Sequence, residues 1–77
     1  MHFHPSTFDY YKPNEAQEAT MAQVRAATKL YAETLDRLLP EGTDKYHCLR
    51  EVRDVGMWAL VSVTRHADGS PRTHENP

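Results

Sequence analysis

The chain has 77 residues, one cysteine and a net charge of -2, and 39% of its residues are hydrophobic. A chain this short buries only about 60% of the surface that its unfolded form exposes, so a lone copy is marginally stable. The single thiol, Cys48, excludes a disulfide within the chain and a cysteine-rich zinc site. Acidic and basic residues are interspersed, which argues against a protein that binds duplex DNA. We therefore expect a single domain, residues 1–77, that gains stability from self-association.

Residues 1–13 form an aromatic arm that is too short to fold alone, and we expect it to be extended or briefly helical. Its sequence "FDYYKPNEAQ" runs into the first helix and carries Phe8, Tyr10 and Tyr11. Such rings offer a nucleobase a stacking face worth roughly 1–3 kcal/mol per base. Alternatively, the rings simply cover the helices that follow. We expect Phe8 to be the buried anchor and a tyrosine to meet a ligand.

A first helix is predicted over residues 14–39. Asn14 is a good N-cap, and Gln17 three residues later completes the pattern of a capping box. No glycine or proline interrupts the segment, and its apolar residues recur at spacings of three and four, which is typical of an amphipathic helix. The predicted stripe consists of Met21, Val24, Ala27, Tyr31, Leu35 and Leu38.

A second helix is predicted over residues 44–66, after a turn at Pro40-Glu41-Gly42-Thr43 in which Thr43 is a fair N-cap. Two long helices joined by a short loop give an antiparallel, all-α hairpin. The predicted stripe of the second helix is Leu49, Val52, Val55 or Gly56, Ala59 and Val63. Residues 67–77 have no periodicity and are interpreted as a polar loop or frayed tail.

The middle of the second helix is apolar nearly all round. Met57, Trp58, Leu60 and Val61 lie off the stripe that faces the first helix. Because one neighbouring helix covers only one face, the remaining face predicts a homo-oligomer built on the second helix.

The sequence offers no strong catalytic or metal-binding pattern. His2 and His4 alternate along the arm, but a third ligand from His47, His66 or His74 has no spacing to recommend it. A small metal-dependent enzyme using His2 and His4 is therefore the weakest of the alternatives. We expect no enzyme, no metal and no cofactor.

Two carboxylates on the second helix, Glu51 and Asp54, lie three residues apart, as an acid–base pair requires. Arg50 and Arg53 interleave with them, and this alternation is more typical of a solvated face with local ion pairs.

Cations on both helices are candidates for binding an anion. Arg25 and Lys29 are four residues apart on the first helix, beside Thr28. This spacing suits a phosphate and is equally the ordinary spacing of a surface helix.

Trp58 is the only tryptophan. With Arg50, Arg53 and Arg65 within a few turns, its ring could stack on a base whose phosphate those arginines hold, although packing is the commoner role.

Three segments together resemble the bacteriophage anti-CBASS cyclic-nucleotide sponges, whose helical hairpin is shared with anti-Thoeris sponges. They are "FDYYKPNEAQ", "VRAATKLYAETL" and "LLPEGTDKYHCLREVRDVGMWALVSVTR". The most specific pieces are the aromatic lead-in to Pro13, the turn carried by Pro40 and Lys45, and Met57-Trp58-Ala59 followed by Arg65. The likeness extends over nearly the whole chain up to Arg65.

The resemblance implies a homohexamer that sequesters cyclic dinucleotides and, in separate pockets, cyclic trinucleotides, without cleaving them. For the dinucleotide it implies a stacking tyrosine at Tyr10, with Tyr11 beside it, and a phosphate-binding Arg25 near Thr28 and Lys29. For the trinucleotide it implies Arg50, Arg53, Trp58 and Arg65.

The chain departs from the family pattern at three positions. Arg53 stands where an acidic residue is usual, Leu60 where an asparagine is usual, and Tyr11 where a histidine is more usual. Arg53 either strengthens binding of a triply charged ring or upsets that pocket, so the trinucleotide site is the less secure of the two.

No apolar run approaches the roughly 18 residues of a membrane span, and the N-terminus lacks the order of a signal peptide. We therefore expect a cytosolic protein, and the resemblance implies the cytoplasm of an infected bacterial host. The rival hypothesis is a protein-interaction module, a helical hairpin whose apolar second helix binds a host or phage protein. It predicts no affinity for nucleotides.

Overall fold

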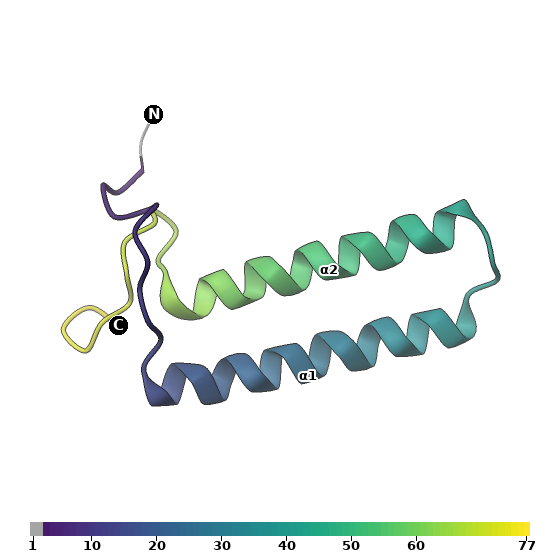
Figure 1. Cartoon of the computed structure of the whole chain (residues 1–77), viewed down its shortest axis with the longest axis horizontal. Helices are drawn as coiled ribbons and strands as arrows, with labels where there is room; N and C mark the ends of the chain where they lie inside the picture. Colours follow the sequence, from purple (N-terminus) through teal and green to yellow (C-terminus); the bar gives the residue numbers. More distant parts are fainter. Residues whose placement is uncertain (1–2) are drawn as a thin grey trace.

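The computed structural model describes residues 3–77. Within this range it contains helix α1 (Glu15–Leu38), helix α2 (Thr43–Thr64) and no strand. The helices lie side by side and antiparallel, and residues 3–14 and 65–77 lie at the end opposite the connecting loop (Figure 1). The molecule measures 47 × 31 × 16 Å, so it is long and thin. The all-helical hairpin predicted from the sequence is confirmed.

The start of α1 is fixed by the predicted capping box. Asn14 Oδ1 accepts a hydrogen bond from the Gln17 backbone N–H at 2.7 Å, and Gln17 Oε1 accepts one from the Asn14 N–H at 3.0 Å. Helix α2 begins differently from the prediction, because its N-cap is Gly42 and Thr43 is already helical. Gly42 has a φ of 157°, a conformation that side chains disfavour, which explains a glycine at this turn.

The two helices touch along a narrow seam and enclose very little core. Val52, with 8% of its surface exposed, is the only buried hydrophobic residue among those described. The partly buried residues on this side of the seam are Met21, Val24, Thr28, Ala32 and Leu35 on α1, and Leu39 directly after it. The predicted stripe was therefore wrong at Ala27, Tyr31 and Leu38, which are exposed.

The phase of the seam is set by the close approach of Thr28 and Gly56. A Cβ atom built on Gly56 would lie 2.7 Å from Thr28 Cγ2 and 3.2 Å from Thr28 Oγ1. Thr28 therefore fills the space that the glycine leaves, and the neighbouring Val55 is turned outward and exposed. Of the alternatives that the sequence left open for α2, Gly56 is the seam residue.

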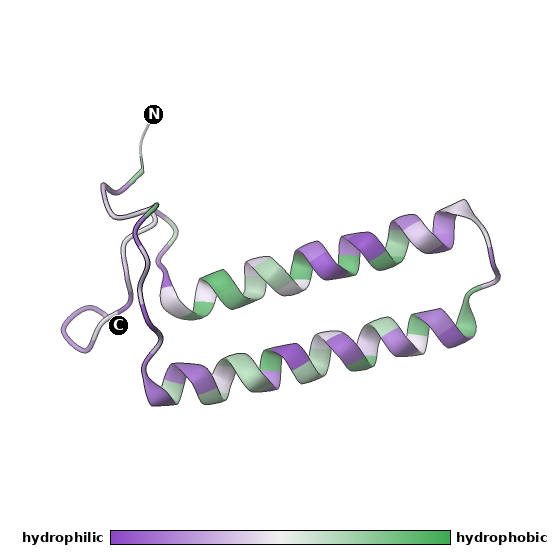
Figure 2. Ribbon diagram, viewed as in Figure 1, coloured by the Kyte–Doolittle hydropathy of each residue, from purple (hydrophilic) through white to green (hydrophobic). Residues whose placement is uncertain are grey.

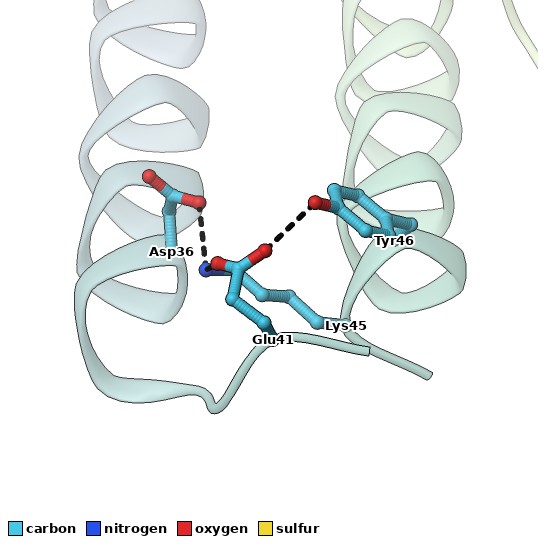
Figure 3. A network of polar contacts seen from close by, with 4 residues as sticks. All are labelled: Asp36, Glu41, Lys45 and Tyr46. Atoms are coloured by element: carbon cyan, nitrogen blue, oxygen red, sulfur yellow. Dashed lines mark hydrogen bonds and ion pairs between the residues drawn. The ribbon is translucent and has the colours of Figure 1, made fainter. Parts of the chain in front are cut away.

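A polar network closes the loop end of the hairpin. Lys45, only 7% exposed, lies 3.2 Å from Asp36 Oδ1 on α1 and 2.6 Å from Glu41 Oε1 in the loop. The Tyr46 hydroxyl donates to the other Glu41 oxygen at 2.7 Å (Figure 3). The hydrogen bond from Lys45, followed by that from Tyr46, lowers the pKa of Glu41, and the same bond to Glu41 raises the pKa of Lys45. The network ties the loop to both helices.

Because of this network, we expect the free energy of unfolding to decrease in acid. Glu41 has a lowered pKa in the folded chain, so its contribution is present above its ordinary pKa of 4.5 and is lost as pH falls through the folded value. Lys45, whose pKa is raised, loses its contribution only as pH rises above its ordinary value of 10.5. The urea concentration at the midpoint of unfolding is therefore expected to decrease as the pH is lowered below 4.5. In the Glu41→Gln variant, the midpoint should depend less on pH in this range. If its pH dependence in acid were unchanged, Glu41 would not be the group responsible.

The arm and the tail close the other end of the hairpin. Arg65 donates from Nη1 to the Ser6 carbonyl at 2.6 Å and to the Gly69 carbonyl at 2.7 Å, and from Nη2 to the Asp9 carbonyl. Its guanidinium also lies over the Tyr11 ring, 4.8 Å from the ring centre. Arg65 thus joins the arm, the end of α2 and the tail.

The tail folds back on α2 and is not frayed at its start. The Arg72 N–H donates to the Thr64 carbonyl at 2.7 Å, and an isolated bridge pairs Arg65 with Pro71. The His4 N–H donates to the Asp68 carbonyl at 2.8 Å, which joins the arm to the tail directly. The prediction of a loop was correct for residues 67–77, but their attachment to the arm was not foreseen.

The prediction that Phe8 anchors the arm was wrong. Phe8 is 82% exposed, and its ring contacts that of Phe3 edge to face, with 5.5 Å between the ring centres. The buried residue of the arm is Ser6, whose hydroxyl lies 2.6 Å from His4 Nδ1. Hydrogen bonds from the Arg65 side chain and between the His4 N–H and the Asp68 carbonyl, and not an aromatic anchor, hold the arm in place.

Candidate functional site

A groove between α1 and α2 gathers four of the predicted site residues. It has a volume of about 430 Å³ and lies over the seam near the contact between Thr28 and Gly56. Its lining consists of Arg25, Thr28, Lys29 and Ala32 from α1, and Leu49, Val52, Arg53, Gly56, Met57 and Leu60 from α2. The groove therefore has an apolar floor and cations from both helices.

Helix geometry explains why these cations meet. Arg25 and Lys29 are four residues apart and so share a face of α1, with Thr28 beside them. Arg53 precedes Gly56 by three residues, so it projects from the same side of α2 as the closest approach of the helices. The two walls of the groove thus carry positive charge at neighbouring levels.

No carboxylate within residues 3–77 forms an ion pair with the cations of this groove. No aspartate or glutamate is among the lining residues. Within residues 3–77, Arg25, Lys29 and Arg53 form no ion pair, although acidic residues outnumber basic ones by eleven to nine in the whole chain. An anion with flat apolar parts matches this combination of cations and floor.

The predicted stacking tyrosines lie elsewhere in the chain. Tyr10, 84% exposed, belongs to the arm at the open end of the hairpin, and Tyr11 lies beneath the Arg65 guanidinium. Arg25 is ten residues beyond the start of α1, which places it roughly 15 Å along the helix axis. A single copy therefore does not bring Tyr10 and Arg25 into one pocket.

A second pocket lies at the open end of the hairpin and has a volume of about 700 Å³. Trp58 and Arg65, both predicted for the trinucleotide site, line it together with Phe3, His66 and Arg72. Trp58 is 72% exposed, so its ring is accessible. The other two predicted members are not there: Arg50 lines neither this pocket nor the groove, and Arg53 lines the groove.

Arg65 and Arg72 are largely engaged in holding the fold. Arg72 Nε donates to the Ser62 carbonyl at 2.8 Å and to the Arg65 carbonyl at 3.0 Å, and Nη1 donates to the Pro77 carbonyl at 2.9 Å. Arg65 is bound by three carbonyls, as described above. These two arginines bring less free positive charge to the second pocket than their number indicates.

The other candidates from the sequence do not form a site in the described part of the chain. His2 lies outside the described residues, and among residues 3–77 no cluster of three or more histidine, cysteine or acidic side chains could hold a metal ion. Glu51 and Asp54 are exposed, and Glu51 lies 3.9 Å from His47 Nε2 on the same helix. Within residues 3–77, neither helix has a stretch both long and apolar enough to cross a membrane.

Sequence reasoning placed one pocket member, Arg53, with the wrong residues and missed another, Phe3. Arg53 was grouped with Trp58 because the two lie within a few turns of each other and because of the resemblance, whereas the structure places Arg53 in the lining of the groove. Phe3 was not considered, since nothing in the sequence places the start of the arm against the end of α2.

The chain matches no protein-family model, no curated protein and no solved structure.

Proposed function

We propose that this chain is a non-enzymatic sponge that binds and sequesters cyclic oligonucleotides, cyclic dinucleotides first among them. The observation that carries the proposal is the groove with Arg25, Lys29 and Arg53 around an apolar floor that contains no carboxylate. Cyclic dinucleotides combine two phosphates with two flat bases, which suits cations beside apolar surface. By the resemblance, a phage would use such a protein to remove a bacterial immune messenger in the host cytoplasm.

The proposal requires more than one copy of the chain. Tyr10 lines neither pocket and so shares none with Arg25 within one copy, but a two-fold axis could place the arm of one copy beside the groove of another. A two-fold symmetric ring would then meet two equal sets of residues. The resemblance implies a hexamer.

The surface of the chain supports self-association. The hairpin exposes 6332 Å², whereas a compact monomer of 8.9 kDa exposes about 4,800 Å². The excess of about 1,500 Å² corresponds to roughly two interfaces of standard size, at about 800 Å² per partner. Exposed apolar residues include Val55, Trp58 and Val61 on α2, and the hydrophobic colouring gathers in the C-terminal half of this helix (Figure 2).

That same face is what favours the second candidate, a module that binds another protein. An exposed tryptophan flanked by valines on a helix is typical of the apolar anchors found at protein interfaces. This function would need neither the cations of the groove nor the tyrosines of the arm. The two candidates therefore differ in whether a purified, homogeneous sample binds cyclic nucleotides.

Replacing Tyr10 by alanine tests the proposal at a residue that does not hold the fold. Loss of one stacked base is expected to weaken binding at least about tenfold, or about 1.4 kcal/mol, in equilibrium dialysis against cyclic di-AMP, cyclic di-GMP and cyclic GMP-AMP. Phe8→Ala, in an equally exposed ring of the same arm, is the matched control and should bind as the unaltered chain does. Sedimentation should show the same assembly for all three proteins. Unchanged affinity of the Tyr10 variant would remove Tyr10 from the site.

A further inference from the structure

Arg53 lies apart from Trp58 and Arg65, with which it was grouped in the sequence analysis. Arg53 lines the groove with Arg25, Thr28 and Lys29, while Trp58 and Arg65 line the pocket at the open end of the hairpin. The two pockets share no lining residue. Arg53 is therefore available to a ligand in the groove, and not to a ligand in the pocket at the open end.

We propose that Arg53 binds a phosphate of the ligand in the groove, opposite Arg25 and Lys29, so that the ligand is held between α2 and α1. This inference rests on the proposed function and adds to it a contact from the second helix. A ligand held in this way needs at least two phosphate groups that point in different directions, as the two phosphates of a cyclic dinucleotide do.

The charges around Arg53 support this role. Its neighbours in the lining are apolar or cationic, with Thr28 the one hydroxyl. Asp54 follows Arg53 in the sequence, yet successive helical residues point about 100° apart, and no ion pair joins Arg53 to an acidic residue within residues 3–77. Three like charges beside one groove repel one another, and an anion with two charges relieves that repulsion.

The geometry of the seam fixes where Arg53 can reach. The helices approach each other where Gly56 of α2 contacts Thr28 of α1. Gly56 lies about one turn after Arg53, and Thr28 lies one residue before Lys29. In an antiparallel pair, residues on the loop side of Gly56 face residues on the loop side of Thr28, which places Arg53 near the level of Lys29. Arg25 lies on the other side of Thr28. The two walls thus offer cations at both ends of the short groove.

Arg53→Ala and Arg50→Ala form a matched pair for the test. Both arginines are exposed and lie one turn apart on α2, but only Arg53 lines the groove. With the cyclic dinucleotide that binds the unaltered chain best, Arg53→Ala is expected to raise Kd at least about tenfold and Arg50→Ala to change it less than about twofold. Arg53→Lys, which keeps the charge but loses the planar fork, should lie between them. Far-UV circular dichroism and sedimentation establish that each variant keeps its helices and assembly.

The outcomes separate this inference from the function on which it rests. If Arg25→Ala abolishes binding while Arg53→Ala binds normally, the groove is the site and the role of Arg53 is refuted. If Arg53→Ala loses only cyclic tri-AMP and keeps the dinucleotide, Arg53 belongs with Trp58 and the inference is equally overturned. If the unaltered chain binds neither ring, the proposed function fails and the role of Arg53 fails with it.

Discussion

Replacing Arg65 by alanine is expected to release the arm and the tail from the end of α2 while both helices remain folded. The guanidinium donates to carbonyls in the arm, at Ser6 and Asp9, and in the tail, at Gly69. Hydrogen bonds from a charged group contribute about 1.5–3 kcal/mol each. Because the substitution removes two or more of these hydrogen bonds, we expect the docking of the arm and the tail to weaken by about 3 kcal/mol.

Hydrogen exchange measures this release residue by residue. The amides of His4 and Arg72, which bond to the Asp68 and Thr64 carbonyls, should lose protection about 100-fold, equivalent to about 2.7 kcal/mol. Amides in the middle of α1 should not change. Arg50→Ala serves as the control, since it removes an exposed arginine of the same helix. Full protection of the His4 and Arg72 amides in the Arg65 variant would show that the arm is held by other contacts.

The second large effect is expected from Gly56→Ala, which should destabilise the hairpin even though alanine favours helix. The new Cβ would lie within 2.7–3.4 Å of all three heavy side-chain atoms of Thr28 beyond its Cα, so rotating that side chain does not clear the space. Overpacking costs typically about 1–3 kcal/mol, and the gain in helix propensity is up to about 1 kcal/mol. We expect a net loss of about 1–2 kcal/mol in urea unfolding at fixed protein concentration.

A double-mutant cycle isolates the contact. Thr28→Ala removes the atoms that the new methyl would meet, so Gly56→Ala should cost less in that background, with a coupling of about 1 kcal/mol. Val55→Ala changes the adjacent, exposed position and tests the effect of helix propensity without the contact. A Gly56→Ala chain more stable than the unaltered one would contradict the close approach of the helices.

The elements of the fold were predictable because their signals are local. Asn14 and Gln17 form the capping box that their spacing predicts, and the glycine after Pro40 marks the turn between the helices. The phase of α1 was not predictable from apolar spacing alone. Thr28 occupies the seam in place of Ala27 because Gly56 leaves space for it, and this depends on the other helix.

The closure at the open end had no sequence signal. Arg65 and Arg72 bind backbone carbonyls. Because every residue has a carbonyl, the sequence does not indicate which residues these arginines bind. The same holds for the candidate site. Helical spacing groups Arg25, Thr28 and Lys29, which line one groove, whereas the place of Arg53 from α2 in that groove depends on the register between the helices.

Calorimetric titration of the purified protein with a cyclic dinucleotide, followed by chromatography of the recovered ligand, tests the central claim most directly. We expect saturable, submicromolar binding at about one ligand per two chains, with the nucleotide returned intact. Absence of heat with every cyclic di- and trinucleotide would contradict it, and the exposed face around Trp58 would then mark the chain as a protein-binding module.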